Sequence, residues 1–200
     1  MKEILENGTN KLCKAIGEVN FEDKRVYANY LAQTYYYVNH SCNLLGLAIS
    51  KMFGPDKRFQ KRFGKHVGEE DRHELLAKKD LERLGFSLED FPELFETSDF
   101  YTSQYWKTQN EDCLSLLGYI VALEHFAIHG GPMIYEKAGG GTFLKVHIDE
   151  DEDHVVHAID MIESLPEERQ KVIIKNIRHT QEGFLKILMA LENNREKVAA

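Results

Sequence analysis

The apolar residues of this chain recur at helical spacing, and this pattern limits the fold more than any other feature of the sequence. Between residues 23 and 53, apolar and aromatic side chains follow one another at separations of three, four and seven: Val26, Tyr30, Tyr37, Leu44, Leu45, Ala48 and Met52. No stretch alternates between apolar and polar residues for long enough to form a sheet. The sequence therefore predicts an all-α protein.

The predicted helices form one bundle of about seven or eight members in a single domain spanning residues 1–200. The four prolines fall where the helical pattern stops or starts: Pro55, Pro92, Pro132 and Pro166. Besides the N-terminal segment, we expect helices over 23–53, 56–84, two within 99–135, then 143–165 and 167–194.

Three connections carry local signals. Gly85 follows Arg83 and should end the second long helix. Ser87 and Asp90 have the spacing of an N-cap followed by a first-turn carboxylate. Residues 139–141 are all glycine and predict a flexible connection, after which Thr142 is a candidate cap for the next helix.

Composition excludes several classes of protein and partner. The net charge of -8 argues against binding to nucleic acid or to an anionic membrane surface. Cys13, Cys42 and Cys113 form no CxxC pair and are too few for a disulfide framework, which favours a reducing cytoplasm. The N-terminal residues mix charges with apolar side chains and resemble neither a signal peptide nor a membrane span. We expect a cytoplasmic protein.

The most specific motif is His147-x3-Asp151-x2-His154. On one helix these three residues fall within about 60° of one another, so that one face presents nitrogen and oxygen ligands for a metal. His157 lies at the edge of that face, as a fourth ligand or as a group that supports one. A solvated acidic helix face is the alternative explanation of the same pattern.

A second motif places His66, Glu69, Glu70 and His73 along one side of the helix expected over 56–84. Glu70 and His73 have the i, i+3 carboxylate–histidine spacing that helical-bundle di-iron proteins use. An exposed helix with Glu–Lys and Glu–Arg pairs would show a similar pattern. We interpret Glu70 and His73 as metal ligands, and His66 as a further candidate.

The third element is Glu124, a single carboxylate in a strongly apolar helix. A buried carboxylate is costly unless a metal or another cation compensates it, so Glu124 is a candidate ligand, unless its helix is turned toward solvent. As walls of an adjoining pocket we select Tyr30, Tyr37, His40 and Phe126, although a hydrogen-bonded core histidine is the more common role for a residue such as His40.

Taken together, these motifs resemble the heme-oxygenase-like helical proteins, a group that includes the TenA thiaminases and the pyrroloquinoline-quinone synthase. Within that group the chain looks like the di-iron oxidases and oxygenases, among them the CADD-type protein. The resemblance rests on His147, Asp151 and His154, on the preceding TFLKVH, on the stretch GEEDRHELLAKKDLERLG, and on Glu124. Many members have a glutamate where this chain has His66.

The resemblance implies a heme-oxygenase-like bundle and a non-heme, iron-dependent enzyme that uses O2 to oxidise a small organic substrate. It implies two iron ions, but His66 puts the second in question: His66 replaces a carboxylate, Glu69 or Glu70 takes over, or only one ion binds. An external electron donor and a homodimer are left open. The alternatives are a metal-free TenA-like thiaminase relative with a cysteine nucleophile, and a non-catalytic helical interaction protein with a vestigial metal site.

Overall fold

The computed structural model describes residues 1–149 and 152–193, and the side chains of residues 1–149 and 155–191. Within these residues the chain is helical and contains no strand, which confirms the predicted all-α class. The α-helices are α1 (Lys2–Glu18), α2 (Lys24–Val38), α3 (Ser41–Ser50), α4 (Lys57–Glu70), α5 (His73–Arg83), α6 (Phe95–Asn110), α7 (Leu116–His129), α8 (Gly131–Ala138), α9 (Thr142–Ile148), α10 (Glu152–Glu163) and α11 (Glu167–Asn193). Short 3-10 helices lie in three connections: η1 (Gly54–Asp56), η2 (Leu88–Asp90) and η3 (Cys113–Ser115).

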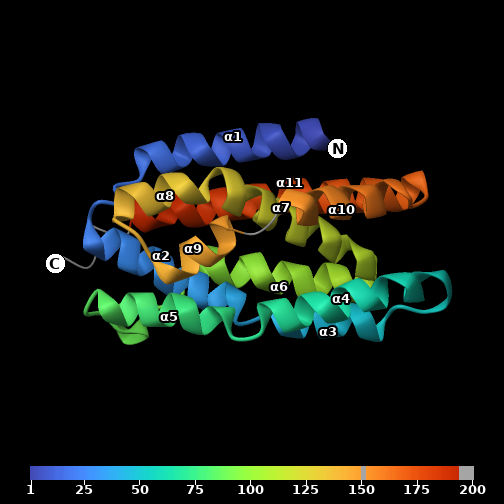
Figure 1. Cartoon of the computed structure of the whole chain (residues 1–200), viewed down its shortest axis with the longest axis horizontal. Helices are drawn as coiled ribbons and strands as arrows, with labels where there is room; N and C mark the ends of the chain where they lie inside the picture. Colours follow the sequence, from blue (N-terminus) through green and yellow to red (C-terminus); the bar gives the residue numbers. More distant parts are fainter. Residues whose placement is uncertain (150–151, 194–200) are drawn as a thin grey trace.

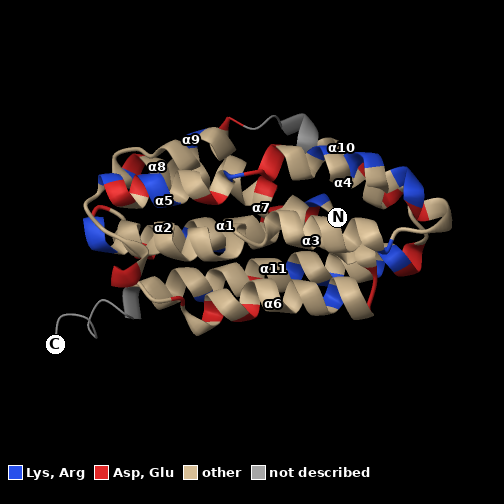
Figure 2. Ribbon diagram, turned by 90° about the horizontal axis from the view of Figure 1, so that it is seen from below, with Lys and Arg blue, Asp and Glu red and all other residues tan. Residues whose placement is uncertain are grey.

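The helices run mainly along the long axis of the molecule (Figure 1). Several are arranged end to end, so that α4 continues the line of α5 along one edge. Seen from below, α6 and α11 form one layer and α4, α5, α9 and α10 form another, with α2 and α3 between them (Figure 2). The helix α11 packs against α1, α6 and α7 and so connects these three helices.

One continuous hydrophobic core joins residues from Leu5 in α1 to Leu191 in α11. Its largest fully buried side chains include aromatic residues from three separate segments, Phe21, Phe63 and Phe184. Burial of this apolar surface is the main force that holds the helices together. The described part of the chain therefore forms its core from contacts between helices far apart in sequence.

Three of the predicted long helices are interrupted in the structure. The helix expected over 23–53 is α2 followed by α3, with a turn at Asn39 and His40. The helix expected over 56–84 breaks at Asp71 and Arg72, between α4 and α5. The helix expected over 143–165 is α9 followed by α10. Apolar spacing persists through such breaks because the helices on both sides pack on the same core, so periodicity alone did not reveal them.

Other local predictions are confirmed. Gly85 has a φ of 87° and follows the end of α5, a left-handed conformation that glycine adopts without strain. The Asp90 side chain accepts hydrogen bonds from the backbone N–H and the hydroxyl of Ser87, at 2.8 and 3.0 Å. The last helix begins at Glu167 as predicted and continues to Asn193.

The glycines at 139–141 make a tight turn against the core. A Cβ atom on Gly141 would lie 2.3 Å from the Tyr27 hydroxyl, so only glycine fits there. The Tyr27 hydroxyl also donates a hydrogen bond to the Gly140 carbonyl oxygen, at 3.1 Å. Thr142 does not cap α9 as predicted: the N-cap is Gly141, and the hydroxyl of Thr142 accepts a hydrogen bond from Arg83 instead.

Candidate metal centre

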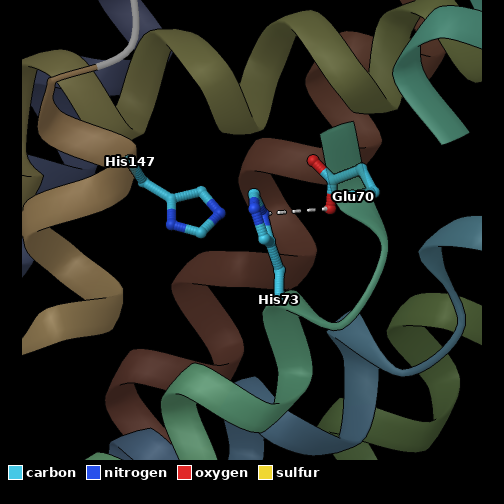
Figure 3. Close-up of side chains that lie close together, drawn as sticks. All are labelled: Glu70, His73 and His147. Carbon is cyan, nitrogen blue, oxygen red and sulfur yellow. Dashed lines mark ion pairs between the residues drawn. The ribbon is translucent and has the colours of Figure 1, made fainter. Parts of the chain in front are cut away.

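Three candidate ligands from separate elements converge in the structure. Glu70 is the last residue of α4, His73 is the first residue of α5, and His147 lies in α9. One ligand atom from each falls within 4.8 Å of the other two. The two imidazole rings stand with centroids 4.9 Å apart and planes at 72°, and Glu70 Oε2 lies 4.0 Å from His73 Nδ1 (Figure 3). The structure thus brings His147, from the first motif, close to Glu70 and His73 of the second motif.

The break between α4 and α5 sets the relative position of Glu70 and His73. Asp71 has φ and ψ of -59° and 121°, and Arg72 has 67° and 14°, values close to those of a type II turn. Arg72 is the one non-glycine residue with positive φ among those described, and a side chain in this conformation is strained. The sequence predicted that Glu70 and His73 share one helix face. In the structure they lie on either side of a turn instead.

The orientation of His147 is fixed by two contacts within α9. Its Nδ1 lies 2.8 Å from the carbonyl oxygen of Phe143, and its ring packs on the Phe143 ring at 4.2 Å. When Nδ1 carries the proton and donates to that carbonyl, the lone pair remains on Nε2. This is how a histidine is held ready to bind a metal through Nε2.

Asp80, which the sequence analysis did not select, anchors α9 to α5. This buried carboxylate accepts a hydrogen bond from the backbone N–H of Phe143 at 2.7 Å and from Arg83 at 2.8 Å. It satisfies one of the N–H groups that the first turn of a helix leaves unpaired. Asp80 thereby positions the helix that carries His147. The only signal in the sequence was a carboxylate on the apolar face of α5.

Both histidines of the candidate metal site, His73 and His147, favour the neutral form. Burial lowers the pKa of His147 to about 4, although the hydrogen bond to Phe143 opposes this effect, and the nearby His73 lowers it further. Burial also lowers the pKa of His73, against the opposing effect of Glu74 and Asp71. Neutral imidazole is the form that binds metal ions, so at neutral pH both rings can act as ligands without first losing a proton.

His66 and Glu124 lie beside the cluster and extend it toward the core. His66 Nδ1 is 3.4 Å from a carboxylate oxygen of Glu69 and 3.8 Å from Glu124, and Nε2 is 3.6 Å from Glu70. The side chains of His66 and Glu124 are 10% and 8% exposed, so Glu124 faces inward rather than toward solvent. His66 therefore lies among three carboxylates, which is a suitable environment for an imidazolium or for a second cation.

The remaining residues of the His147 motif are described only in part. Asp151 and the side chain of His154 lie outside the described residues, so their contribution stays a prediction. The described helix α9 ends at Ile148 and α10 begins at Glu152, which differs from the continuous helix on which the spacing argument relied. His157 is exposed on α10.

A cavity of about 90 Å³ opens onto the candidate metal site. Tyr30, Tyr37 and Phe126 line it, together with Glu70, His147, His66 and Glu124. His40 is not among the lining residues. It precedes α3, stacks on the Tyr101 ring at 3.8 Å, and places Nδ1 3.0 Å from the Tyr105 hydroxyl. His40 is accordingly a hydrogen-bonded histidine outside the cavity, the alternative that the sequence had left open.

The donor set fits an iron ion. Two histidines and one carboxylate with open positions are the ligands typical of non-heme Fe(II) oxygenases. Within the described residues, the buried Nδ1 atom of His73 has no hydrogen-bond partner, which is unfavourable unless a metal or another ligand occupies that position. No other group of three histidine, cysteine, aspartate or glutamate side chains converges in this way among the residues described.

No single helix of the described residues is long and apolar enough to cross a membrane. The segments Cys113–His129 and Gly131–Ala138 reach the required length and composition only as a pair, and they meet at a bend of 48°.

The sequence matches no family model and no curated protein, whereas the structure resembles several solved ones. A domain of unknown function with a heme oxygenase-like fold from Shewanella denitrificans aligns with a TM-score of 0.83 and 19% identity, over 96% of this chain and 92% of that one. A TenA homologue from Pyrococcus furiosus aligns with a TM-score of 0.73 and 13% identity, over 95% of this chain and 98% of that one. Another TenA homologue, from Pseudomonas syringae pv. tomato, aligns with a TM-score of 0.75 and 13% identity, over 94% of this chain and 91% of that one. The chain therefore has a heme oxygenase-like, TenA-like helical fold.

Proposed function

We propose that this protein is a non-heme iron-dependent oxidase or oxygenase that uses O2 to oxidise a small organic substrate. The observation that carries the proposal is the convergence of Glu70, His73 and His147 beside an apolar cavity. These three side chains are only partly exposed, and Glu124 beside them is buried, so the carboxylates favour a nearby cation. A site with open positions next to a cavity can admit both O2 and a substrate.

Each ligand has a defined contribution. Glu70 would supply the negative charge, while His147 would bind through Nε2 because the Phe143 carbonyl occupies Nδ1. Iron bound here would supply the one-electron chemistry that O2 requires. The apolar walls, among them Leu44, Leu116 and Phe143, would keep bulk water away from the reacting atoms.

A second iron ion is part of the proposal, and Glu124 and His66 are the described residues that would help to hold it. Asp151 and His154 would complete that position. Because His66 already lies within 3.8 Å of both Glu70 and Glu124, a protonated His66 could instead take the place of the second cation. Counting bound ions therefore decides between one iron and two.

The test is anaerobic loading with ferrous iron followed by metal analysis. We expect stoichiometric binding by the wild type and, for His73→Gln and Glu70→Gln, a loss of affinity greater than the roughly 10–100-fold caused by removing a mere supporting partner. His40→Gln is the matched control, since it removes a histidine outside the cavity and should bind iron normally. Wild type without iron binding, or ligand variants that bind like the control, would contradict the proposal.

The TenA-like fold supports a second candidate, a metal-free relative of the TenA thiaminases with a cysteine nucleophile. None of the described cysteines lines the cavity: Cys42 contacts the Val67 carbonyl, and Cys113 contacts the Lys51 carbonyl. Burial raises the pKa of both thiols, which disfavours the nucleophilic thiolate. Thiamin breakdown by the wild type that is abolished in Cys42→Ala would favour this candidate over the iron enzyme.

A further inference from the structure

The lining of the cavity beside the candidate metal site restricts the kind of molecule that can bind there. It lies between α2, α3, α4, α7 and α9, and most of its lining is apolar, including Leu45, Ile120 and Leu123. Its volume of about 90 Å³ is below the roughly 150 Å³ of an engineered protein cavity that admits benzene. The cavity therefore suits a compact, mainly apolar molecule.

One wall residue has a polar group that the protein leaves unsatisfied. Tyr119 is 4% exposed, and within the described residues its buried hydroxyl has no hydrogen-bond partner. Its ring packs on Phe100 with centroids 5.3 Å apart, which holds the side chain in place at the cavity wall. A buried hydroxyl without a partner is unfavourable, so a partner supplied by a ligand would lower the free energy of the complex.

The hydroxyl of Tyr119 keeps its proton at neutral pH and can therefore donate a hydrogen bond. Burial raises its pKa well above the usual value, and the negative charge of Glu70 raises it further, so the proton stays on the oxygen. A molecule in the cavity that accepts this hydrogen bond would be held in the space that Glu70 and His147 also line.

The charge of the cavity restricts the ligand as well. Glu70 and Glu124 both line it, and their carboxylates would repel an anion that is not bound to a metal. An acceptor that carries no charge, such as a carbonyl oxygen, accepts the Tyr119 hydrogen bond without this repulsion.

We propose that Tyr119 is a positioning and specificity-determining residue, whose hydroxyl donates a hydrogen bond to a neutral acceptor on a small, mainly apolar substrate. That the bound molecule is a substrate rests on the proposed function. The preference of the cavity for a molecule with a hydrogen-bond acceptor does not. Removal of the hydroxyl should abolish the preference for an acceptor while leaving the apolar cavity intact.

The experiment uses metal-free protein and three probes of equal heavy-atom number, with affinities measured by NMR titration. Butan-2-one carries the acceptor, 2-methylbut-1-ene replaces its oxygen with a CH2 group, and propanoate carries a charge. Because the alkene is the more hydrophobic probe, the quantity compared is the ratio of the butan-2-one affinity to the alkene affinity, and the Tyr119 hydrogen bond should make this ratio about 5–10-fold higher in the wild type than in Tyr119→Phe. Propanoate should bind more weakly than butan-2-one, because it carries a charge.

Tyr119→Phe should show a lower ratio of ketone to alkene affinity than the wild type, and Tyr135→Phe, which alters a tyrosine outside the cavity lining, should retain the wild-type ratio. The carbonyl stretching frequency of bound butan-2-one gives a second reading in the wild type alone, because donation from Tyr119 lowers it. A ratio of ketone to alkene affinity that is the same in the wild type and in Tyr119→Phe would overturn the inference.

The two proposals fail separately. A ketone preference that depends on Tyr119 in a protein that binds no iron would leave the binding inference standing and reject the iron enzyme. Stoichiometric iron binding without any ketone preference would reject the role of Tyr119 and leave the proposed function in place.

Discussion

Two regions of the molecule differ in how their helices are built. The half formed by α6, α7 and α11 consists of long helices in close contact, and α11 runs without interruption from Glu167 to Asn193. Buried Asn176 ties this half together by donating hydrogen bonds to Gln104 and to the Ser115 carbonyl, at 2.7 and 2.8 Å. The half formed by α4, α5 and α9 has shorter helices, and it contains the strained turn at Arg72.

The candidate ligands are distributed according to this difference. Glu70, His73 and His147 all come from the interrupted half, near helix ends. Only Glu124 comes from the close-packed half, in α7, which faces both regions. Interruptions let side chains converge from several directions, whereas continuous packing supplies the rigid support against which they are held. The predictions below test that division of roles.

The largest effect on stability is expected in the close-packed half. A Cβ atom on Gly118 would lie 2.5 Å from the backbone oxygen of Ile173, so Gly118→Ala must push α7 away from α11. We expect a loss of about 3 kcal/mol in the free energy of unfolding, measured by urea denaturation.

Gly46→Ala provides the control, because a Cβ atom there meets nothing within 4 Å in the exposed middle of α3. It should stabilise the protein by about 0.5–1 kcal/mol. Similar free energies of unfolding for the two variants would contradict close packing of α7 on α11.

An intermediate effect is expected from acidification of the metal-free protein. The pKa of His147 is lowered from its usual value to about 4, mainly by burial, so the unfolded chain takes up this proton at higher pH than the folded one. Stability should therefore fall as pH decreases from about 6.5 to 4, with a contribution from His147 of about 2 kcal/mol between pH 7 and pH 5.

His147→Gln should lose less stability over that interval than the wild type, as followed by urea denaturation at each pH. His125, in the contact between α7 and α1, also has a pKa lowered to about 4 by burial, so part of the pH dependence should remain in the variant. An unchanged pH dependence in His147→Gln would indicate that the half formed by α4, α5 and α9 is more open to solvent than the structure shows.

The smallest effect is expected at the strained turn. Arg72→Gly removes the side chain that disfavours a φ of 67°, and we expect stabilisation by about 1 kcal/mol in thermal unfolding, with iron affinity retained. Lys61→Gly, on the exposed side of the continuous helix α4, should instead destabilise by about 1 kcal/mol. Destabilisation by both variants would show that the turn at Arg72 is not strained in solution.

How far the sequence predicted the site depends on the residue. Glu70, His73, His147 and Glu124 were selected from spacing and apolar context, and the structure brings these side chains to one region of the core. Asp80 was not selected, because its role depends on the N-terminus of α9, a helix more than sixty residues away in sequence. His40 was assigned to the cavity, although the structure places it against Tyr101.

The sequence by itself determined the all-helical class, because apolar spacing and the signals at Gly85 and Ser87 depend only on local chain geometry. It also determined which residue types could bind a metal. Only the tertiary structure decided where the long helices break and which ligands meet. The turn at Asp71 and Arg72 has no local signal, and a residue with positive φ is tolerated there because the helices on either side pack on different partners, α4 on α3 and α5 on α2.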